Sequence, residues 1–314
     1  MMPSVAFVLP NYCGRELLER FLPSVLRAAE AAATQVIVVD DASTDDSVPF
    51  LRSAFPSVQV IPLPTNVGFA RTVNAGVEAA EADIIVALNT DVQPQPDFLP
   101  PLLRALEQPD VFAAVPRIRR PLQGGVAESA IAGEFRRGLF RLRFLGDAPF
   151  AARPEPFPTL YPVLAAAAVR RDLYLQFGGL DDLFAPYYWE DADLGYRAWR
   201  AGYRVLCVPG SIVDHHAGSI SQTQPPDRVV LAQDANRFLF TWKNLHDPRW
   251  TLAHWLMLGP HCALSLCTGR ARFVRGLLAA LPRLPKALRQ RRRALLLARI
   301  PDREAIRRAN PFAS

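Results

Sequence analysis

Short apolar runs alternate with stretches of helical spacing through the first 120 residues. Four of these runs predict buried strands, at residues 5–9, 36–39, 58–61 and 84–88. Between them, apolar residues recur at every third or fourth position over 17–29 and again over 69–80, which predicts two helices. The alternation predicts a doubly wound, mostly parallel α/β sheet with helices on both faces.

The regular pattern stops in the middle of the chain and then returns. Residues 117–160 are rich in Arg, Gly and Pro, and we expect a variable loop or insertion there. Residues 165–177 have helical spacing that ends at two glycines, which predicts a helix. Another helix is expected from Glu190 to Gly202, followed by a strand at 203–208.

Charge separates the last part of the chain from the rest. The sequence of 314 residues is 50% apolar and has a net charge of +6. Residues 251–314 contain 13 basic and two acidic residues, a net +11, which leaves 23 basic and 28 acidic residues, a net −5, in the remainder. We therefore predict a domain over 1–245 and a basic amphipathic helical tail over 246–314 that lies on an anionic membrane surface. The alternative is a tail that packs on the domain or on a second subunit.

The same composition excludes several other classes. A general nucleic-acid-binding protein would carry its basic surface on the folded domain, so no nucleic-acid partner is expected. No apolar stretch reaches the roughly 18 residues of a membrane span, because His254, Gly259, Pro260 and His261 interrupt the nearest one. The chain also starts without the features of a secretory signal. We expect a cytoplasmic protein, peripheral on the inner face of the cell membrane.

Acidic residues follow two of the predicted strands directly. Asp40 and Asp41 come after the second strand, and Asp91 comes after the fourth. Ligands of a doubly wound sheet bind beyond the carboxyl ends of its strands, so these side chains should share one crevice. Clustered carboxylates favour a cation, and Mg²⁺ or Mn²⁺ would bring substrate phosphates with it. The alternative is that each Asp only caps the loop that follows it.

A second acidic cluster begins the helix predicted at Glu190. Glu190, Asp191 and Asp193 lie in its first turn, where the free backbone N–H groups favour acids. That preference does not explain the aromatic residues directly before it, Tyr187 to Trp189. An ionised carboxylate beside a partly dry aromatic pocket is suited to act as general base for a hydroxyl.

Two nucleotide-binding motifs are absent. The first strand leads to Pro10–Gly14 and not to the G-x-G-x-x-G turn of a dinucleotide-binding dehydrogenase. The sequence also lacks the Walker motif, and it contains only two lysines, Lys243 and Lys286. A nucleotidyltransferase would be expected to have a glycine-rich phosphate loop after the first strand, which Pro10–Gly14 does not supply.

The ordered set of motifs resembles the inverting nucleotide-sugar glycosyltransferases of family 2, which have the GT-A fold. The resemblance is strongest to the non-processive, rhamnosyltransferase-like branch, because only an imperfect echo of the processive Q-x-x-R-W motif occurs, at His246–Trp250. It covers about residues 4–245. The matching segments are Val8–Tyr12, Val36–Asp45, Asn66–Gly76, Ala87–Val92, Phe177–Asp182, Glu190–Leu194 and Val208–His215.

The resemblance implies a donor site for a dTDP-, UDP- or GDP-linked sugar and a divalent metal, Mn²⁺ or Mg²⁺. Asp91 would bind the metal as the last residue of the family's D-x-D element, whose first residue here is Asn89. His215 matches a histidine that some members add to the metal shell, and His216 is the neighbouring candidate. The implied nucleotide-binding residues are Pro10, Tyr12 and Asp40 at the base and ribose, Asp41 nearby, Arg71 near the diphosphate and Asn74 in support.

The resemblance also implies the catalytic residues. Asp191 matches the family's base, which takes the proton of an acceptor hydroxyl as its oxygen attacks the anomeric carbon. Glu190, Asp193 and Trp189 would orient the acceptor or support the start of the helix. Asp181 and Asp182, on the preceding loop, are expected to be surface acids.

Together these features predict a metal-dependent hexosyltransferase of bacterial cell-surface polysaccharide synthesis. With the basic tail, the acceptor is expected to be a saccharide, possibly one carried on a lipid. The alternative is a non-catalytic, membrane-associated protein that binds sugar nucleotides or acts as a scaffold and descends from a transferase.

Overall fold

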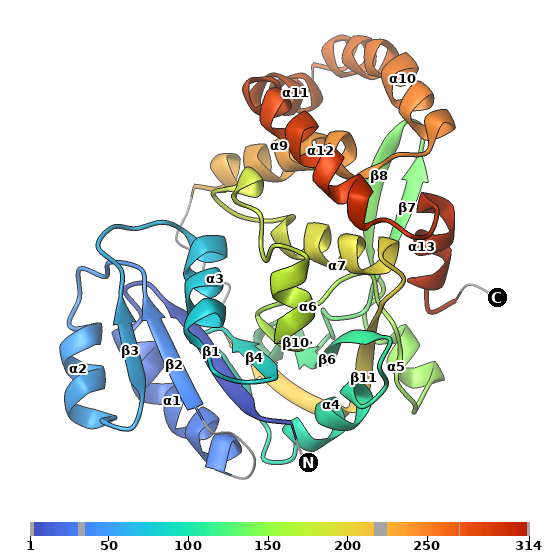
Figure 1. Cartoon of the computed structure of the whole chain (residues 1–314). Coiled ribbons are helices and arrows are strands. Elements are labelled where there is room, and N and C mark those ends of the chain that lie inside the picture. Colours follow the sequence, from blue (N-terminus) through green and yellow to red (C-terminus); the bar gives the residue numbers. More distant parts are fainter. Residues whose placement is uncertain (1–2, 31–34, 217–224, 270, 313–314) are drawn as a thin grey trace.

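A computed structural model describes residues 3–30, 35–216, 225–269 and 271–312. Its centre is a nine-stranded sheet with the order β3-β2-β1-β4-β10-β6-β11-β5, in which β9 also pairs with β11 (Figure 1). The first four strands are parallel neighbours, and β1, β2 and β4 are mostly aliphatic, as expected for strands buried on both faces, whereas β3 lies at the partly exposed edge. Their bounds are β1 Val5–Asn11, β2 Gln35–Asp40, β3 Gln59–Pro62 and β4 Ile84–Leu88.

The second half of the sheet is mixed. Strand β10 pairs antiparallel with both β4 and β6, and β11 runs parallel to β6. Two short strands, β5 and β9, pair antiparallel with β11. The bounds are β5 Val92–Pro94, β6 Val111–Arg119, β9 Phe157–Pro158, β10 Ala166–Arg170 and β11 Arg204–His215.

Amphipathic helices cover the sheet. In Figure 1, α3 and α7 lie on the side of the sheet that faces the C-terminal helices, and α1 and α4 lie on the other side. The apolar face of α1 is buried, with Leu18, Leu22 and Val25 at 1% exposure each. The predicted α/β architecture is therefore confirmed. The helices are α1 Arg15–Glu30, α2 Ser47–Ala54, α3 Phe69–Ala79, α4 Leu99–Leu106, α6 Arg171–Gln176 and α7 Glu190–Arg200.

Two expectations for the middle of the chain were wrong. The helix predicted over 165–177 is strand β10 followed by the short helix α6, because residues 166–170 find hydrogen-bonding partners on both sides, in β4 and β6. The supposed loop over 117–160 contains the end of β6, an antiparallel hairpin, a short helix and β9. The hairpin strands are β7 Ile131–Arg136 and β8 Leu139–Phe144, and the helix is α5 Ala148–Ala152.

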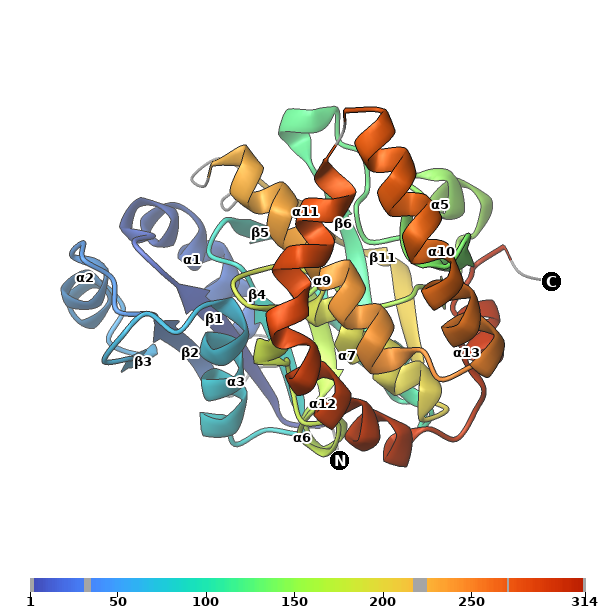
Figure 2. The ribbon, with the colours of Figure 1, turned by 90° about the horizontal axis from the view of Figure 1, so that it is seen from above.

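The C-terminal helices pack on one another and on the sheet domain. Figure 2 shows α10, α11 and α12 around α9, with α13 beside α7. The anchor of α13 is Asp302, which is 2% exposed, accepts a 2.6 Å bond from the Tyr196 hydroxyl and pairs with Arg200. The bounds are α9 Pro226–Asn244, α10 Pro248–Cys267, α11 Arg272–Ala280, α12 Leu284–Leu297 and α13 Asp302–Arg308.

Helix α10 buries two polar side chains, His254 and Ser265, and exposes several apolar ones on its outward face. His254 is 2% exposed, and its Nε2 accepts a 2.9 Å bond from the Trp242 indole while Nδ1 lies 2.7 Å from the carbonyl of Gly138 in the β7–β8 turn. A Cβ on Gly138, at φ +76°, would lie 2.8 Å from the carbonyl of Ala253, so this turn needs glycine. Five side chains of α10 are 50–66% exposed, namely Leu252, Trp255, Leu256, Leu264 and Leu266. None of the helices in the described ranges is long and apolar enough to cross a membrane.

Candidate active site

A cavity of about 960 Å³ opens at the carboxyl ends of β1 and β4. We call it the strand-end cavity. Pro10 lines it from the end of β1 and Tyr12 directly after that strand, Asp91 lines it after β4, and Asp41 lines it after β2. Parallel strands bring these residues together although they are up to about 80 positions apart in the sequence. Other polar lining residues are Asn11, Asn66, Thr72, Asn89, Thr90, Arg228 and Arg283.

Asp40 and Asp41 hold the loops that form this cavity. Asp40 is 2% exposed and accepts bonds from the Asn11 amide at 2.8 Å and from the Ser43 hydroxyl at 2.6 Å. Asp41 accepts bonds from the backbone N–H groups of Val67 at 2.7 Å and Gly68 at 2.9 Å. Both carboxylates therefore shape the walls, and of the two only Asp41 lines the cavity.

Arg71 and Asn74 project from α3 away from the cavity lining. The Arg71 guanidinium is 59% exposed and pairs with Asp182 at 2.5 Å. Asn74 bonds both backbone groups of Leu180, at 2.8 and 3.0 Å, and accepts a bond from the Tyr174 hydroxyl at 2.6 Å. In this arrangement both side chains join α3 to the loop that precedes α7.

The Asp91 carboxylate, which lines the strand-end cavity, lies next to the imidazole of His215. Its Oδ1 is 3.3 Å from His215 Nε2, and His215 Nδ1 is 2.6 Å from Glu128 Oε1. Burial disfavours the charged imidazole, but Asp91 and Glu128 raise the pKa of His215 to about 9. His216 lies apart, stacked on Phe21 at 4.8 Å between ring centroids.

Four buried polar atoms in this corner lack hydrogen-bond partners. They are Asn89 Oδ1, both carboxylate oxygens of Asp91, and His215 Nε2. Unpaired buried polar groups are costly, so such a group of oxygen and nitrogen atoms fits a divalent cation. A carboxylate behind a ligating imidazole, as Glu128 is behind His215, is the usual orienting partner in metal sites. Within the described residues, no three His, Cys, Asp or Glu side chains converge on one such point.

A second cavity, of about 590 Å³, contains the acids that begin α7. We call it the α7 cavity. Asp191 Oδ2 accepts a 3.1 Å bond from the backbone N–H of Leu164, whereas Oδ1 is buried without a partner. Burial and the neighbouring Glu190 raise the pKa of Asp191 well above its ordinary value. Burial also raises the pKa of Glu190 to about 7, so the two carboxyls titrate as a pair.

The backbone before α7 is held in a conformation that residues other than glycine rarely adopt. Tyr188 and Trp189 have φ values of 71° and 83°. Asn236 of α9 fixes this loop, because its amide donates to the carbonyls of Phe184 at 2.6 Å, Tyr187 at 3.1 Å and Tyr188 at 3.0 Å. Tyr187 lines the strand-end cavity, and Tyr188 and Trp189 line the α7 cavity. The aromatic loop thus belongs to both cavities.

Asp193 supports the helix start and does not line either cavity. Its side chain is fully buried and bonds Arg197 at 2.8 Å, the Lys243 ammonium at 2.7 Å and the Asn244 amide at 2.7 Å. Asp181 and Asp182, expected to be surface acids, are partly buried and paired. Lys243 lies 2.6 Å from Asp181, and Lys286 of α12 lies 2.5 Å from Asp182.

Sequence reasoning missed several residues of these cavities. Glu128 lies in the stretch that was expected to be a loop, and Asn236 in a helix whose pattern of apolar positions gives no sign of its partners. Arg228 and Arg283 reach the strand-end cavity from α9 and from the segment before α12. No local motif marks these residues, because only the packing of the C-terminal helices brings them to the cavity.

The sheet order, the acidic strand ends and the covering helices define a GT-A glycosyltransferase fold. The chain belongs to glycosyl transferase family 2, whose model matches residues 6–174, so the predicted family is confirmed. It is 31% identical, over 81% of this chain and 91% of the relative, to an N-acetylglucosaminyl-diphospho-decaprenol L-rhamnosyltransferase of Mycobacterium tuberculosis. The expectation of a rhamnosyltransferase-like glycosyltransferase is confirmed at that level.

Two solved structures show the same fold. GalNAc-T7, with UDP, GalNAc and Mn²⁺, has a TM-score of 0.61 at 16% identity and covers 78% of this chain and 49% of its own. The mannosyltransferase PcManGT of Pyrobaculum calidifontis, in complex with GDP-Man and Mn²⁺, has a TM-score of 0.54 at 18% identity, over 95% of this chain and 86% of its own. Both neighbours are nucleotide-sugar enzymes solved with a divalent metal.

Proposed function

We propose that the protein is a metal-dependent, inverting and non-processive hexosyltransferase of bacterial cell-surface polysaccharide synthesis. It would transfer a sugar from a dTDP-, UDP- or GDP-linked donor to a hydroxyl of a lipid-linked saccharide. One observation carries the proposal, namely that a carboxylate-rich strand-end cavity and a second cavity with a partly free carboxylate share the aromatic loop 187–189. The rhamnosyltransferase relative supports a lipid-linked acceptor, and the neighbours solved with UDP and with GDP-Man support a nucleotide-linked donor.

The donor nucleotide would occupy the strand-end cavity. Tyr12 and Pro10 would contact the base and ribose, and the Arg228 and Arg283 guanidiniums would contact the phosphates. Asp91 and His215 would hold Mn²⁺ or Mg²⁺, with Asn89 beside them and Glu128 fixing the imidazole. When bound, the metal supplies positive charge for the departing diphosphate.

Asp191 would be the catalytic base. Its partner-free Oδ1 accepts the proton of an acceptor hydroxyl as that oxygen bonds to the anomeric carbon and the bond to the nucleoside diphosphate breaks on the opposite face. A single displacement of this kind inverts the configuration of the anomeric carbon. Leu164 positions the carboxylate through its backbone N–H, and Asn236 holds the loop before it.

We also propose that the outer face of α10 binds an anionic membrane surface. Its exposed apolar side chains, Trp255 among them, suit the bilayer interface, and the +11 charge of residues 251–314 suits anionic headgroups. We propose with it a peripheral position on the inner face of the membrane. The same helices pack on one another and on the domain, so the proposed membrane contact would use only their outer face.

Calorimetric titration with UDP, dTDP and GDP, each with and without Mn²⁺, tests the proposal. Binding of one nucleotide, strengthened by the metal and weakened in Asp91→Asn, is the expected result. Failure of all three nucleotides under both conditions would contradict it and would favour a non-catalytic scaffold.

A further inference from the structure

Three arginines converge on the α7 cavity from three separate elements. Arg141 comes from β8, Arg237 from the middle of α9, and Arg272 is the first residue of α11. All three line the cavity that contains Asp191. Because the elements are distant in the sequence, only the packing of α9, α11 and the hairpin creates this cluster.

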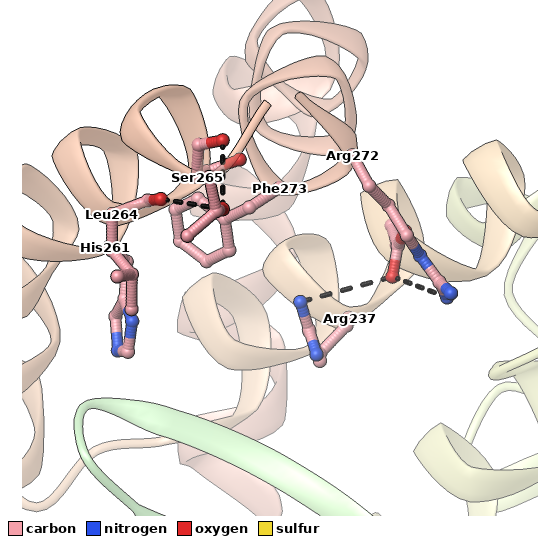
Figure 3. A pocket seen from close by; sticks show the side chains of 8 residues that line it. Arg237, His261, Leu264, Ser265, Arg272 and Phe273 are labelled. Atoms are coloured by element: carbon pink, nitrogen blue, oxygen red, sulfur yellow. Dashed lines mark hydrogen bonds and ion pairs between the residues drawn. The ribbon is translucent and has the colours of Figure 1, made fainter. Parts of the chain in front are cut away.

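Two of the three guanidiniums, those of Arg237 and Arg272, form ion pairs with the same carboxylate, that of Asp234. Asp234 Oδ2 lies 2.5 Å from Arg272 Nε, and Asp234 Oδ1 lies 3.9 Å from Arg237 Nη2, and dashed lines in Figure 3 mark both pairs. Arg237 Nε is buried without a hydrogen-bond partner. Among the described residues Arg141 forms no ion pair, and none of the three pairs with Glu190 or Asp191. Asp234 is thus the carboxylate that pairs with the cluster, while Glu190 and Asp191 line the same cavity.

The position of Arg237 also disfavours the charge of its own guanidinium. Burial lowers the pKa of Arg237, and the nearby charges of Arg141 and Arg272 lower it further against the effect of Asp234. Like charges held this close are destabilising in the free protein. An anion bound among them would relieve the repulsion.

A third cavity, of about 550 Å³, adjoins the arginines and is lined in part by α10. It shares Asp234, Arg237 and Arg272 with the α7 cavity and is completed by apolar and polar side chains of α10 and α11, among them Leu264 and Phe273 (Figure 3). Leu264 is 63% exposed and belongs to the outward apolar face of α10. The proposed base Asp191, the three arginines and the exposed apolar face of α10 thus lie in this order along adjoining cavities.

We propose that Arg141, Arg237 and Arg272 bind the diphosphate of a prenyl-diphosphate-linked acceptor, whose saccharide reaches Asp191 and whose prenyl chain leaves along α10. A guanidinium is the side chain best suited to bidentate recognition of phosphate. Guanidiniums from three separate elements can contact both phosphate groups of a diphosphate, whereas a monophosphate offers only one such group. The inference rests on the proposed function and names the residues that select its acceptor.

Calorimetric titration with farnesyl diphosphate tests the site in the full chain. Mn²⁺ and a saturating nucleoside diphosphate are present, so that the probe does not enter the donor cavity. Arg141→Ala and Arg237→Gln are each expected to weaken binding at least about tenfold, since each removes a charged hydrogen-bonding group. Arg143→Ala is the matched control, because Arg143 is exposed on the same strand outside the cavity lining and should leave binding unchanged. Arg141 is exposed and unpaired, so its variant is expected to fold normally.

Three results would overturn the inference. These are equal affinity of the wild type and both variants, absence of binding to the wild type, or equal affinity for farnesol and farnesyl diphosphate. Tighter binding of farnesyl diphosphate than of farnesyl monophosphate supports the diphosphate assignment. Nucleotide binding is measured in the wild type and in the same variants. A wild type that binds no nucleotide would count against the proposed function. Binding of the prenyl probe that depends on the arginines reports on this site alone.

Discussion

The ammonium of Lys243 lies 2.7 Å from the fully buried carboxylate of Asp193, and this pair joins α9 to the first turn of α7. The same ammonium lies 2.6 Å from Asp181, on the loop before α7. Although burial alone would raise the pKa of Asp181, Lys243 helps to hold it below its ordinary value. One cation thus ties the helix that carries Asp191 to the first of the C-terminal helices.

Replacing Lys243 should destabilise the fold strongly. Lys243→Met leaves Asp181 without the ammonium and Asp193 with Arg197 as its remaining counter-ion, and the loss of one partner of a buried pair costs about 3–5 kcal/mol. Denaturant unfolding measures this. The other lysine of the chain is the control, since Lys286 and Asp182 are 38% and 31% exposed and Lys286→Met should cost no more than about 1 kcal/mol. Equal losses in the two variants would contradict the buried-pair argument.

Removing the charge of the proposed base should abolish turnover and spare donor binding. Asp191→Asn keeps the bond from Leu164 N–H and the shape of the side chain, but the amide cannot accept a proton. We expect kcat to fall by about 10²–10⁴ with an unchanged affinity for the nucleotide, as measured by calorimetry. Near-wild-type turnover in this variant would assign the base to another residue.

The pH profile should report the coupled carboxyls of α7. A base acts only when it is ionised, so kcat/KM is expected to fall as the pH drops through the neutral range, because the pKa of Glu190 is about 7 and that of Asp191 is raised. Glu190→Gln removes the charge that raises the pKa of Asp191, so its acidic limb should shift to lower pH by roughly one unit. Glu78→Gln, on the exposed face of α3, should not move the limb. A profile unaffected by Glu190→Gln would argue against the coupling.

The two neighbouring histidines should respond differently to substitution. His215→Ala removes a proposed metal ligand, and Glu128→Gln loosens the imidazole behind it, so both should raise the Mn²⁺ concentration for half-maximal activity by about 10–100-fold. His216→Ala is the control, because its ring stacks on Phe21 and bonds Gln93. If His216→Ala raised the Mn²⁺ concentration for half-maximal activity and His215→Ala did not, His216 would be the metal ligand.

Membrane binding should depend on the outward face of α10. Leu256 is 66% exposed, and Leu256→Glu places a charge where an apolar side chain would enter the interface. We expect sedimentation with phosphatidylglycerol vesicles to weaken about tenfold. Leu122→Glu changes an equally exposed leucine on a different element, 78% exposed, and should leave binding unchanged. Equal sedimentation of both variants would place the membrane contact elsewhere.

The sequence by itself determined β1 to β4, the start of β11, the helices α1, α3 and α7, and the acids that follow β2 and β4 or begin α7. Aliphatic runs such as Ile84–Leu88 are buried on both faces, and Asp41, Asp91 and Asp191 lie in cavities as their motif positions imply. These features follow from local spacing, because a buried strand and the acid at its carboxyl end are both encoded by a few consecutive residues.

Tertiary structure decided what local spacing leaves open. Residues 166–170 became a strand because partners on both sides satisfied their backbone groups, which outweighed helical spacing. Arg71 and Asn74 were committed to contacts with the loop before α7, and Glu128, Asn236 and the three arginines reached the cavities through packing between distant elements. The burial of His254 in α10 likewise depends on the hairpin turn that its side chain contacts, and no pattern within the helix reveals that partner.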